Sequence, residues 1–145
     1  YTTQTPQSNT VQSENSVQQG KALYEAGRFA EAVKVLEQAA AAFKATGDKL
    51  NQAMTLSNLS LVYQQLGQWT QAEGAITKSL NLLKNGDNSK QRFAIFAQAL
   101  DVQGRLQLAR GQTQAALSTW QEAAKIYKQI GDEATLTRNR INTAQ

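Results

Sequence analysis

Few residues in this sequence could carry out chemistry. The 145-residue chain contains no His and no Cys, so catalysis would fall to carboxylates, Lys, Tyr and Ser. Asp101 and Arg105 are four residues apart, and Glu122 and Lys125 are three apart, which are the spacings of ion pairs on a solvated helix surface. No phosphate-binding loop, dinucleotide-binding glycine pattern or calcium loop is present. The sequence therefore predicts a non-enzymatic protein with no catalytic residue, no metal ligand and no cofactor.

The apolar pattern in the middle of the chain predicts a pair of helices joined by a turn. Apolar positions step by three, four and three residues through Leu56, Leu59, Tyr63 and Leu66. That spacing places them on one helical face. Gly67 follows, where a left-handed conformation would close the helix. Apolar spacing then resumes over 69–84, which predicts a second helix that starts at a half-exposed Trp69.

Small residues predict that these two helices approach each other closely. Ser60, Ala72 and Ser79 lie at positions that would face the partner helix. Gly74 lies inside the second helix, where glycine costs about 1 kcal/mol relative to alanine. We therefore expect a close contact at Gly74 as well.

The same hairpin pattern occurs three times. Segments 26–32, 66–72 and 110–116 align on their glycines, which are separated by 67 − 27 = 40 and 111 − 67 = 44 residues. Each second helix is followed by a Gly-Asp step, at 47–48, 86–87 and 131–132. The glycine would cap the outgoing helix and the aspartate would be the N-cap of the next one. Helix pairs repeating at this period predict a solenoid.

The pattern resembles the tetratricopeptide repeat, in its long-repeat bacterial variant. In the middle unit the matching positions are Leu56, Leu59, Ser60, Tyr63, Gly67, Ala72, Ile76 and Ser79. In the other units they are Gly20, Leu23, Gly27, Ala32, Leu36 and Ala39, then Leu100, Gly104, Gly111, Ala116, Trp120 and Ala123. The family's closing proline is replaced by the Gly-Asp step, and Gln19, Gln103 and Gln107 stand where apolar residues are usual. The resemblance implies an all-α fold, a right-handed superhelical array of antiparallel helix hairpins, with Trp120 in the core.

The chain is predicted to hold one domain after a disordered polar leader, residues 1–12. The domain would cover 13–145, with repeats at about 13–47, 48–86 and 87–131 and a terminal capping helix at 132–145. The expected helices cover about 13–26, 29–46, 48–66, 69–84, 88–110 and 113–130. The unfinished last unit indicates a fragment of a longer protein.

Charge and hydropathy argue against nucleic-acid and membrane partners but do not decide the localisation of the protein. The net charge of +4 is modest and scattered, so we expect no nucleic-acid partner. No apolar run is long enough for a membrane span, so we expect no membrane partner. The localisation is either cytoplasmic or exported, because the chain does not begin with Met and a cleaved signal peptide would explain this.

The resemblance implies that the first helices line a concave groove that binds a peptide. The groove residues would be Lys21, Tyr24, Asn58, Leu61, Gln65, Asp101, Arg105 and Asn142. Further positions on the same faces are Val17, Gln18, Met54, Ser57, Gln98, Val102, Leu108 and Arg138. Of the family's carboxylate clamp for acidic chain ends only Asn58 matches, so a chaperone C-terminus is not the expected ligand.

Three hypotheses follow for function. The leading one is a non-catalytic protein–protein interaction module, or scaffold, that binds a peptide or neighbouring domain in its groove. The second is self-association into a homo-oligomer through Ala134, Leu136 and Ile141 of the terminal helix. The third is a regulatory segment of a larger caspase-like protease chain, which the resemblance to long bacterial arrays implies.

Overall fold

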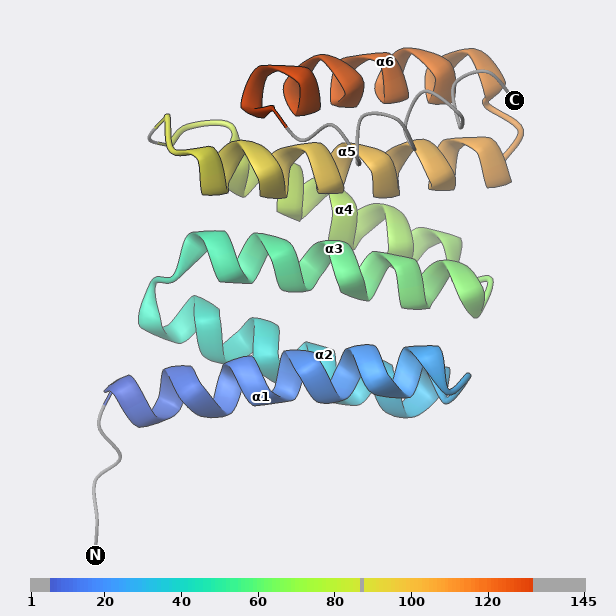
Figure 1. Cartoon of the computed structure of the whole chain (residues 1–145). Helices are drawn as coiled ribbons and strands as arrows, with labels where there is room; N and C mark the ends of the chain where they lie inside the picture. The colour runs from blue at the N-terminus through green and yellow to red at the C-terminus, as the bar shows by residue number, and fades with distance from the viewer. Residues whose placement is uncertain (1–5, 87, 132–145) are drawn as a thin grey trace, which may run out of the picture.

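The computed structural model describes residues 6–86 and 88–131, and within them the chain forms six α-helices and no strand. The helices are α1 (Pro6–Glu25), α2 (Phe29–Thr46), α3 (Lys49–Gln65), α4 (Trp69–Leu83), α5 (Lys90–Ala109) and α6 (Thr113–Ile130). They pair as the hairpins α1–α2, α3–α4 and α5–α6, stacked in that order (Figure 1). The predicted all-α solenoid is confirmed.

Each hairpin turns at the predicted glycine. Gly67 has a φ of +69°, a conformation in which a Cβ would be strained. The backbone N–H groups of Gly67 and of the next residue donate to the carbonyls of Gln64 and Tyr63, at 3.1 and 2.9 Å. These bonds satisfy carbonyls that the end of α3 would otherwise leave unpaired. Gly27 and Gly111, both with φ of +78°, close their helices with the same pair of bonds.

Buried hydroxyl groups join the two helices of the middle hairpin. Ser60 Oγ donates to the Ala72 carbonyl at 2.8 Å, and Ser79 Oγ donates to the Ala53 carbonyl at 2.7 Å. The Ser57 and Ser79 hydroxyls also lie 3.0 Å apart. Because a short side chain can reach a backbone carbonyl only when two helices lie close together, these bonds confirm the predicted close approach. They also satisfy polar atoms that burial would otherwise leave without water.

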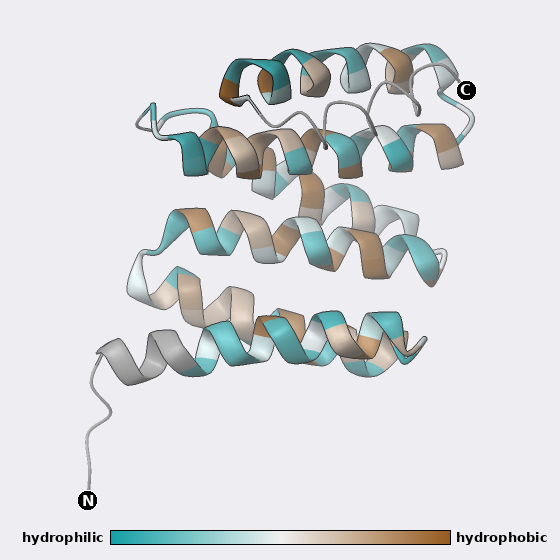
Figure 2. Ribbon diagram, viewed as in Figure 1, coloured by the Kyte–Doolittle hydropathy of each residue, from teal (hydrophilic) through white to brown (hydrophobic). Residues whose placement is uncertain are grey.

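Neighbouring hairpins pack through the second helix of one and the first helix of the next. Thus α2 lies on α3 and α4 lies on α5, whereas no Cα atom of α2 lies within 8 Å of a Cα atom of α4. The first hydrophobic cluster contains Ala32, Leu36, Ala40, Leu56, Leu59, Val62 and Ala75. The second contains Ala53, Ala72, Ile76, Leu83, Ile95, Ala99, Val102 and Leu106. Figure 2 shows hydrophobic and hydrophilic positions alternating along the helices.

Two glycines inside helices permit close packing. A Cβ at Gly104 would lie 2.6 Å from Trp120 Nε1, and one at Gly20 would lie 2.6 Å from Leu36 Cδ2. Alanine at either position would therefore displace its neighbour. Trp120 is a core residue, 8% exposed, and Trp69 is 37% exposed, as predicted for both.

The helix α1 begins at Pro6, earlier than the predicted start at residue 13. Residues 6–12, expected to be part of a disordered leader, are therefore helical. Proline suits the first turn of a helix because its missing N–H would have no intrahelical partner there. The polar sequence that follows carries no apolar period, so the pattern gave no sign of a helix.

The Gly-Asp steps do not all act alike. At the first, Gly47 has a φ of +75° and closes α2. Asp48 is the N-cap of α3, and its side chain accepts from the Asn51 backbone N–H at 3.2 Å. Gly131 likewise closes α6 in the left-handed conformation, while Asp132 lies outside the described residues.

The second step is different, and the prediction that Gly86 and Asp87 act as caps is wrong. Gly86 is not among the glycines with positive φ, and the N-cap of α5 is Ser89, whose hydroxyl accepts from the Arg92 backbone N–H at 3.1 Å. The Arg92 guanidinium, buried at 8% exposure, donates to the Leu83 carbonyl at the end of α4. The Arg92 side chain thus satisfies a carbonyl at the end of α4, as the backbone N–H groups at a left-handed glycine do for α2 and α6. Because Arg92 lies in the next helix, the local spacing around Gly86 does not reveal it.

The expected close contact at Gly74 is also absent, because no atom outside its own helix lies within 4 Å of where its Cβ would be.

Two glycine substitutions should change stability in opposite directions. Gly67→Ala should lower the free energy of unfolding by about 1–2 kcal/mol, because Gly67 has a left-handed φ. Gly74→Ala should raise that free energy by about 0.5–1 kcal/mol, because alanine is the better helix former. Urea denaturation with unchanged m-values would measure both. A loss of stability in Gly74→Ala would contradict the open environment.

Arg92→Ala should lower the free energy of unfolding by about 1–3 kcal/mol, because it leaves a buried carbonyl unpaired and removes packed side-chain atoms. Arg105→Ala is the matched control, since Arg105 is exposed on the same helix. The control should stay within about 0.5 kcal/mol of wild type. Equal unfolding midpoints for the two variants would show that Arg92 does not hold the connection between α4 and α5.

Candidate functional site

Two helices from different hairpins bring four of the predicted groove residues together. Lys21 and Tyr24 of α1 face Asn58 and Leu61 of α3 across a cavity of about 40 Å³. The rest of its lining is apolar or small: Gly20, Leu36 and Val62. The cavity exists because α1 and α3 hardly touch each other, while α2 packs against both. It is large enough for a small side chain or a few water molecules.

The spacing of these residues explains why they meet. Positions three and four apart share a helical face, so Lys21 and Tyr24 project together, as do Asn58 and Leu61. Gln65 continues the α3 row as an exposed residue near the end of the helix. The Tyr24 ring is held by Phe29, with centroids 5.6 Å apart and the rings tilted by 58°.

Some positions expected in the groove are core residues instead. Their exposed fractions are 1% for Val17, 4% for Ser57 and 6% for Val102. Val17 packs in a cluster with Ala39 and Phe43, and Ser57 is bonded to Ser79. A helical face predicts the direction of a side chain, but whether a neighbouring helix covers it depends on the stacking.

The side-chain amide nitrogen of Asn58 is buried without a hydrogen-bond partner among the described residues. A buried donor left unsatisfied costs about 1–3 kcal/mol, and folded proteins rarely leave one. Because Asn58 also lines the cavity, a hydrogen-bond acceptor placed there could satisfy it after a small side-chain rotation.

The α5 residues predicted for the groove do not reach this cavity. Asp101 accepts a hydrogen bond from the Tyr127 hydroxyl of α6 at 3.0 Å, so it faces its own hairpin. Its expected ion pair with Arg105 is not formed. Within 6–86 and 88–131 the ion pairs are Arg28–Glu31 at 2.6 Å and Arg110–Glu73 at 2.7 Å, so the expected Glu122–Lys125 pair is not formed either. Arg105 is exposed on α5, and Asn142 lies outside the described residues.

A side-chain bridge closes the space between α3 and α5. Gln64 Nε2 donates to the Val102 carbonyl at 3.3 Å, and α3 makes more contact with α5 than with α1. The cavity beside Asn58 therefore lies between the first and second hairpins.

The described residues hold no group of three or more Asp or Glu side chains arranged to bind a metal ion. Likewise, none of the helices in the described part of the chain has the length and apolar character needed to cross a bilayer.

Comparison with known families decides what this architecture is. A model of the tetratricopeptide repeat matches residues 12–85, just over half of the chain. The chain belongs to the tetratricopeptide repeat family. The match covers the first two hairpins, which are the ones that form the cavity. The third hairpin has the same turn, since the residue after its glycine has φ and ψ of −92° and 64°, against −88° and 74° in the second.

Tetratricopeptide repeats generally mediate protein–protein interaction, and the family is typically a non-catalytic module. A comparison with curated proteins returns no match to this chain. The partner, the bacterial origin and the link to a caspase-like protease remain predictions.

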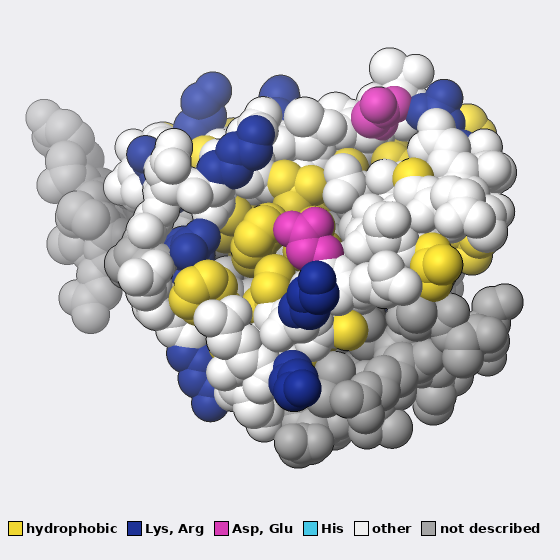
Figure 3. All heavy atoms as spheres, turned by 90° about the horizontal axis from the view of Figure 1, so that it is seen from above, with side chains coloured by type: hydrophobic (Ala, Val, Ile, Leu, Met, Phe, Trp, Pro, Cys, Tyr) yellow, Lys and Arg dark blue, Asp and Glu magenta, His cyan; other side chains and the backbone are white. Residues whose placement is uncertain are grey.

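The third hairpin forms one end of the described repeat stack. Figure 3, which looks onto this end, shows hydrophobic side chains near the centre beside an acidic group, with Lys and Arg side chains around them. Within this hairpin lies a cluster of buried residues: Ala97, Leu100, Ala123, Ile126 and Tyr127. The terminal residues predicted to cap it or to mediate self-association, Ala134, Leu136, Arg138 and Ile141, lie outside the described residues.

Asn58→Leu should raise the free energy of unfolding by about 1 kcal/mol, because it removes an unsatisfied buried donor and keeps a similar volume beside apolar neighbours. Gln65→Leu is the control, because replacing a side-chain amide with leucine at an exposed position removes no buried polar atom. Urea midpoints would measure both. A clear loss of stability in Asn58→Leu would mean that its amide is satisfied in the folded protein.

Proposed function

We propose that this tetratricopeptide repeat domain binds a peptide from a partner protein at the cavity between α1 and α3. The proposal is carried by the unpaired Asn58 amide in a cavity shared by two hairpins. Asparagine suits this role because its amide can donate to a backbone carbonyl and accept from a backbone N–H. One such residue can thus hold an extended or helical peptide through its main chain.

The other residues of the cavity define what the peptide would present. Tyr24 and Leu61 offer apolar surface at the rim, and the volume of about 40 Å³ admits one small side chain. Lys21 is exposed and can pair with a carboxylate or carbonyl oxygen of the peptide. The peptide would therefore carry a small apolar residue in the cavity and an acceptor beside Lys21. Because only Asn58 matches the family's carboxylate clamp, we do not propose a carboxylate-clamp ligand.

The experiment is a selection of displayed random peptides on the wild-type domain, followed by calorimetric titration of the enriched sequences. We expect the affinity for Asn58→Leu to fall by about tenfold or more, since a buried polar contact to the peptide is lost. Arg105→Ala, on a helix that does not reach the cavity, should bind within about threefold of wild type.

The stability of each variant separates a lost contact from unfolding. Asn58→Leu is expected to be at least as stable as wild type, so weaker binding cannot come from loss of the fold. If every enriched peptide binds Asn58→Leu as tightly as wild type, the cavity is not the peptide site.

A further inference from the structure

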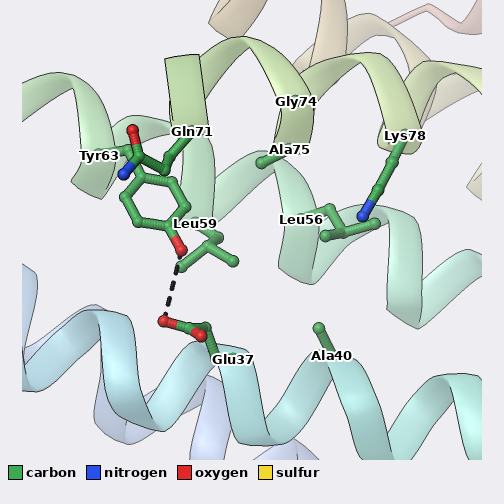
Figure 4. Close-up of a pocket in the computed structure, with 9 residues that line it drawn as sticks. All are labelled: Glu37, Ala40, Leu56, Leu59, Tyr63, Gln71, Gly74, Ala75 and Lys78. Carbon is green, nitrogen blue, oxygen red and sulfur yellow. Dashed lines mark hydrogen bonds between the residues drawn. The ribbon is translucent and has the colours of Figure 1, made fainter. Parts of the chain in front are cut away.

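A second, larger pocket opens between α2 and α4, with α3 as its floor. Its volume is about 370 Å³, within the range of ligand pockets in proteins. Figure 4 shows its lining, which comprises Glu37, Ala40, Leu56, Leu59, Tyr63, Gln71, Gly74, Ala75 and Lys78. The pocket forms because α2 and α4 rest on α3 without meeting each other.

This pocket faces away from the groove. Counting 100° per residue, the pocket residues of α3 lie roughly 160° around the helix from Asn58 and Leu61. Along α4 the lining residues recur at positions 71, 74, 75 and 78, so one side of that helix is turned to the pocket over about 10 Å. The two sites therefore use opposite sides of α3 and could be occupied at the same time.

The surroundings of Gly74 give no structural reason for a glycine at this position. Its backbone is helical, and no atom outside the helix would meet a Cβ there within 4 Å. Glycine in a helix interior costs about 1 kcal/mol relative to alanine. Gly20 and Gly104, by contrast, each permit a close helix contact. What Gly74 does provide is space beside the pocket.

The two ends of the pocket carry opposite charges. At one end the Tyr63 hydroxyl donates to Glu37 Oε1 at 3.3 Å. Burial, and then the charge of Glu37 and its hydrogen bond, raise the pKa of Tyr63 above the ordinary value of 10.0, so Tyr63 remains a donor at neutral pH. At the other end Lys78, from α4, lines the pocket together with Leu56 (Figure 4). Between these ends the floor and walls are apolar or small.

We propose that this pocket binds a short segment of a partner protein through one bulky apolar side chain inserted beside Gly74. The segment would carry a basic residue toward Glu37 and an acidic residue toward Lys78. A Leu, Met or Phe side chain would fill the open space beside Gly74, and such an anchor in a pocket commonly dominates the energy of an interface. The charges at the ends would fix the direction of the segment. The inference is independent of the groove, because none of its residues lines the cavity between α1 and α3.

Peptides with a central Leu, Met or Phe and random flanks provide the probe, selected on the Asn58→Leu variant so that the groove is disabled. We expect the enriched peptides to lose at least about tenfold in affinity on adding Gly74→Leu, whose side chain would occupy the pocket. Adding Gly74→Ala, which leaves most of the space open, should change their affinity by less than about threefold. Thermal melting would show that both variants remain folded.

Charge reversal gives a second test that does not fill the pocket. Lys78→Glu should weaken the enriched peptides, and changing their acidic residue to Lys should restore the affinity. The proposal is overturned if Gly74→Leu leaves affinity unchanged, or if the peptides show no basic and acidic flanks. It is equally overturned if sedimentation shows a wild-type dimer that Gly74→Leu dissociates, since the occupant would then be a second copy of the chain.

Discussion

The close antiparallel approach of the two helices in each hairpin is the constraint on which the rest of this structure depends. A left-handed glycine reverses the chain within a few residues, and small residues then let the helix backbones lie near each other. In the middle hairpin the Ser60 and Ser79 hydroxyls show this close approach, because each donates a hydrogen bond to a backbone carbonyl of the opposite helix. Because each hairpin is thin, its neighbours can stack on it and bury the two clusters that lie between successive hairpins.

The stacking makes α3 the wall between two different surfaces. Its partners on one side are α1 and the small cavity at Asn58, and on the other side are α2, α4 and the larger pocket at Tyr63. A helix in the middle of a solenoid is covered only along the lines where its neighbours touch it. The strips between those lines stay open, and their width depends on how far apart the neighbouring helices stand. Here α2 and α4 stand apart, so the pocket between them has the greater volume.

Features that depend on local spacing could be predicted from the sequence, and features that depend on stacking could not. The turns at Gly27, Gly67 and Gly111 and the Asp48 cap involve residues within a few positions of one another, so their patterns are visible in the chain. The capping of α4 by Arg92 and the pairing of Asp101 with Tyr127 join different helices. The cavity was found in part, since Lys21, Tyr24, Asn58 and Leu61 share helical faces, but the burial of Val17 and Ser57 depends on neighbours that no pattern specifies. The pocket between α2 and α4 was not predicted, although Gln71, Gly74 and Lys78 are spaced so that they share one face of α4.

Some residues of this chain lower the stability of the fold without a compensating contact, and we infer function at those positions. Trp120 and Asn58 both bury a side-chain nitrogen without a partner among the described residues, yet the two differ in surroundings. The Trp120 ring lies against Gly104, so closely that a Cβ there would be 2.6 Å from its nitrogen. Packing compensates for the lost hydrogen bond, and no ligand could enter. Asn58, by contrast, lines a cavity of about 40 Å³. The same contrast holds between Gly104, which a close helix contact explains, and Gly74, which borders open space and for which we propose an occupant of the pocket.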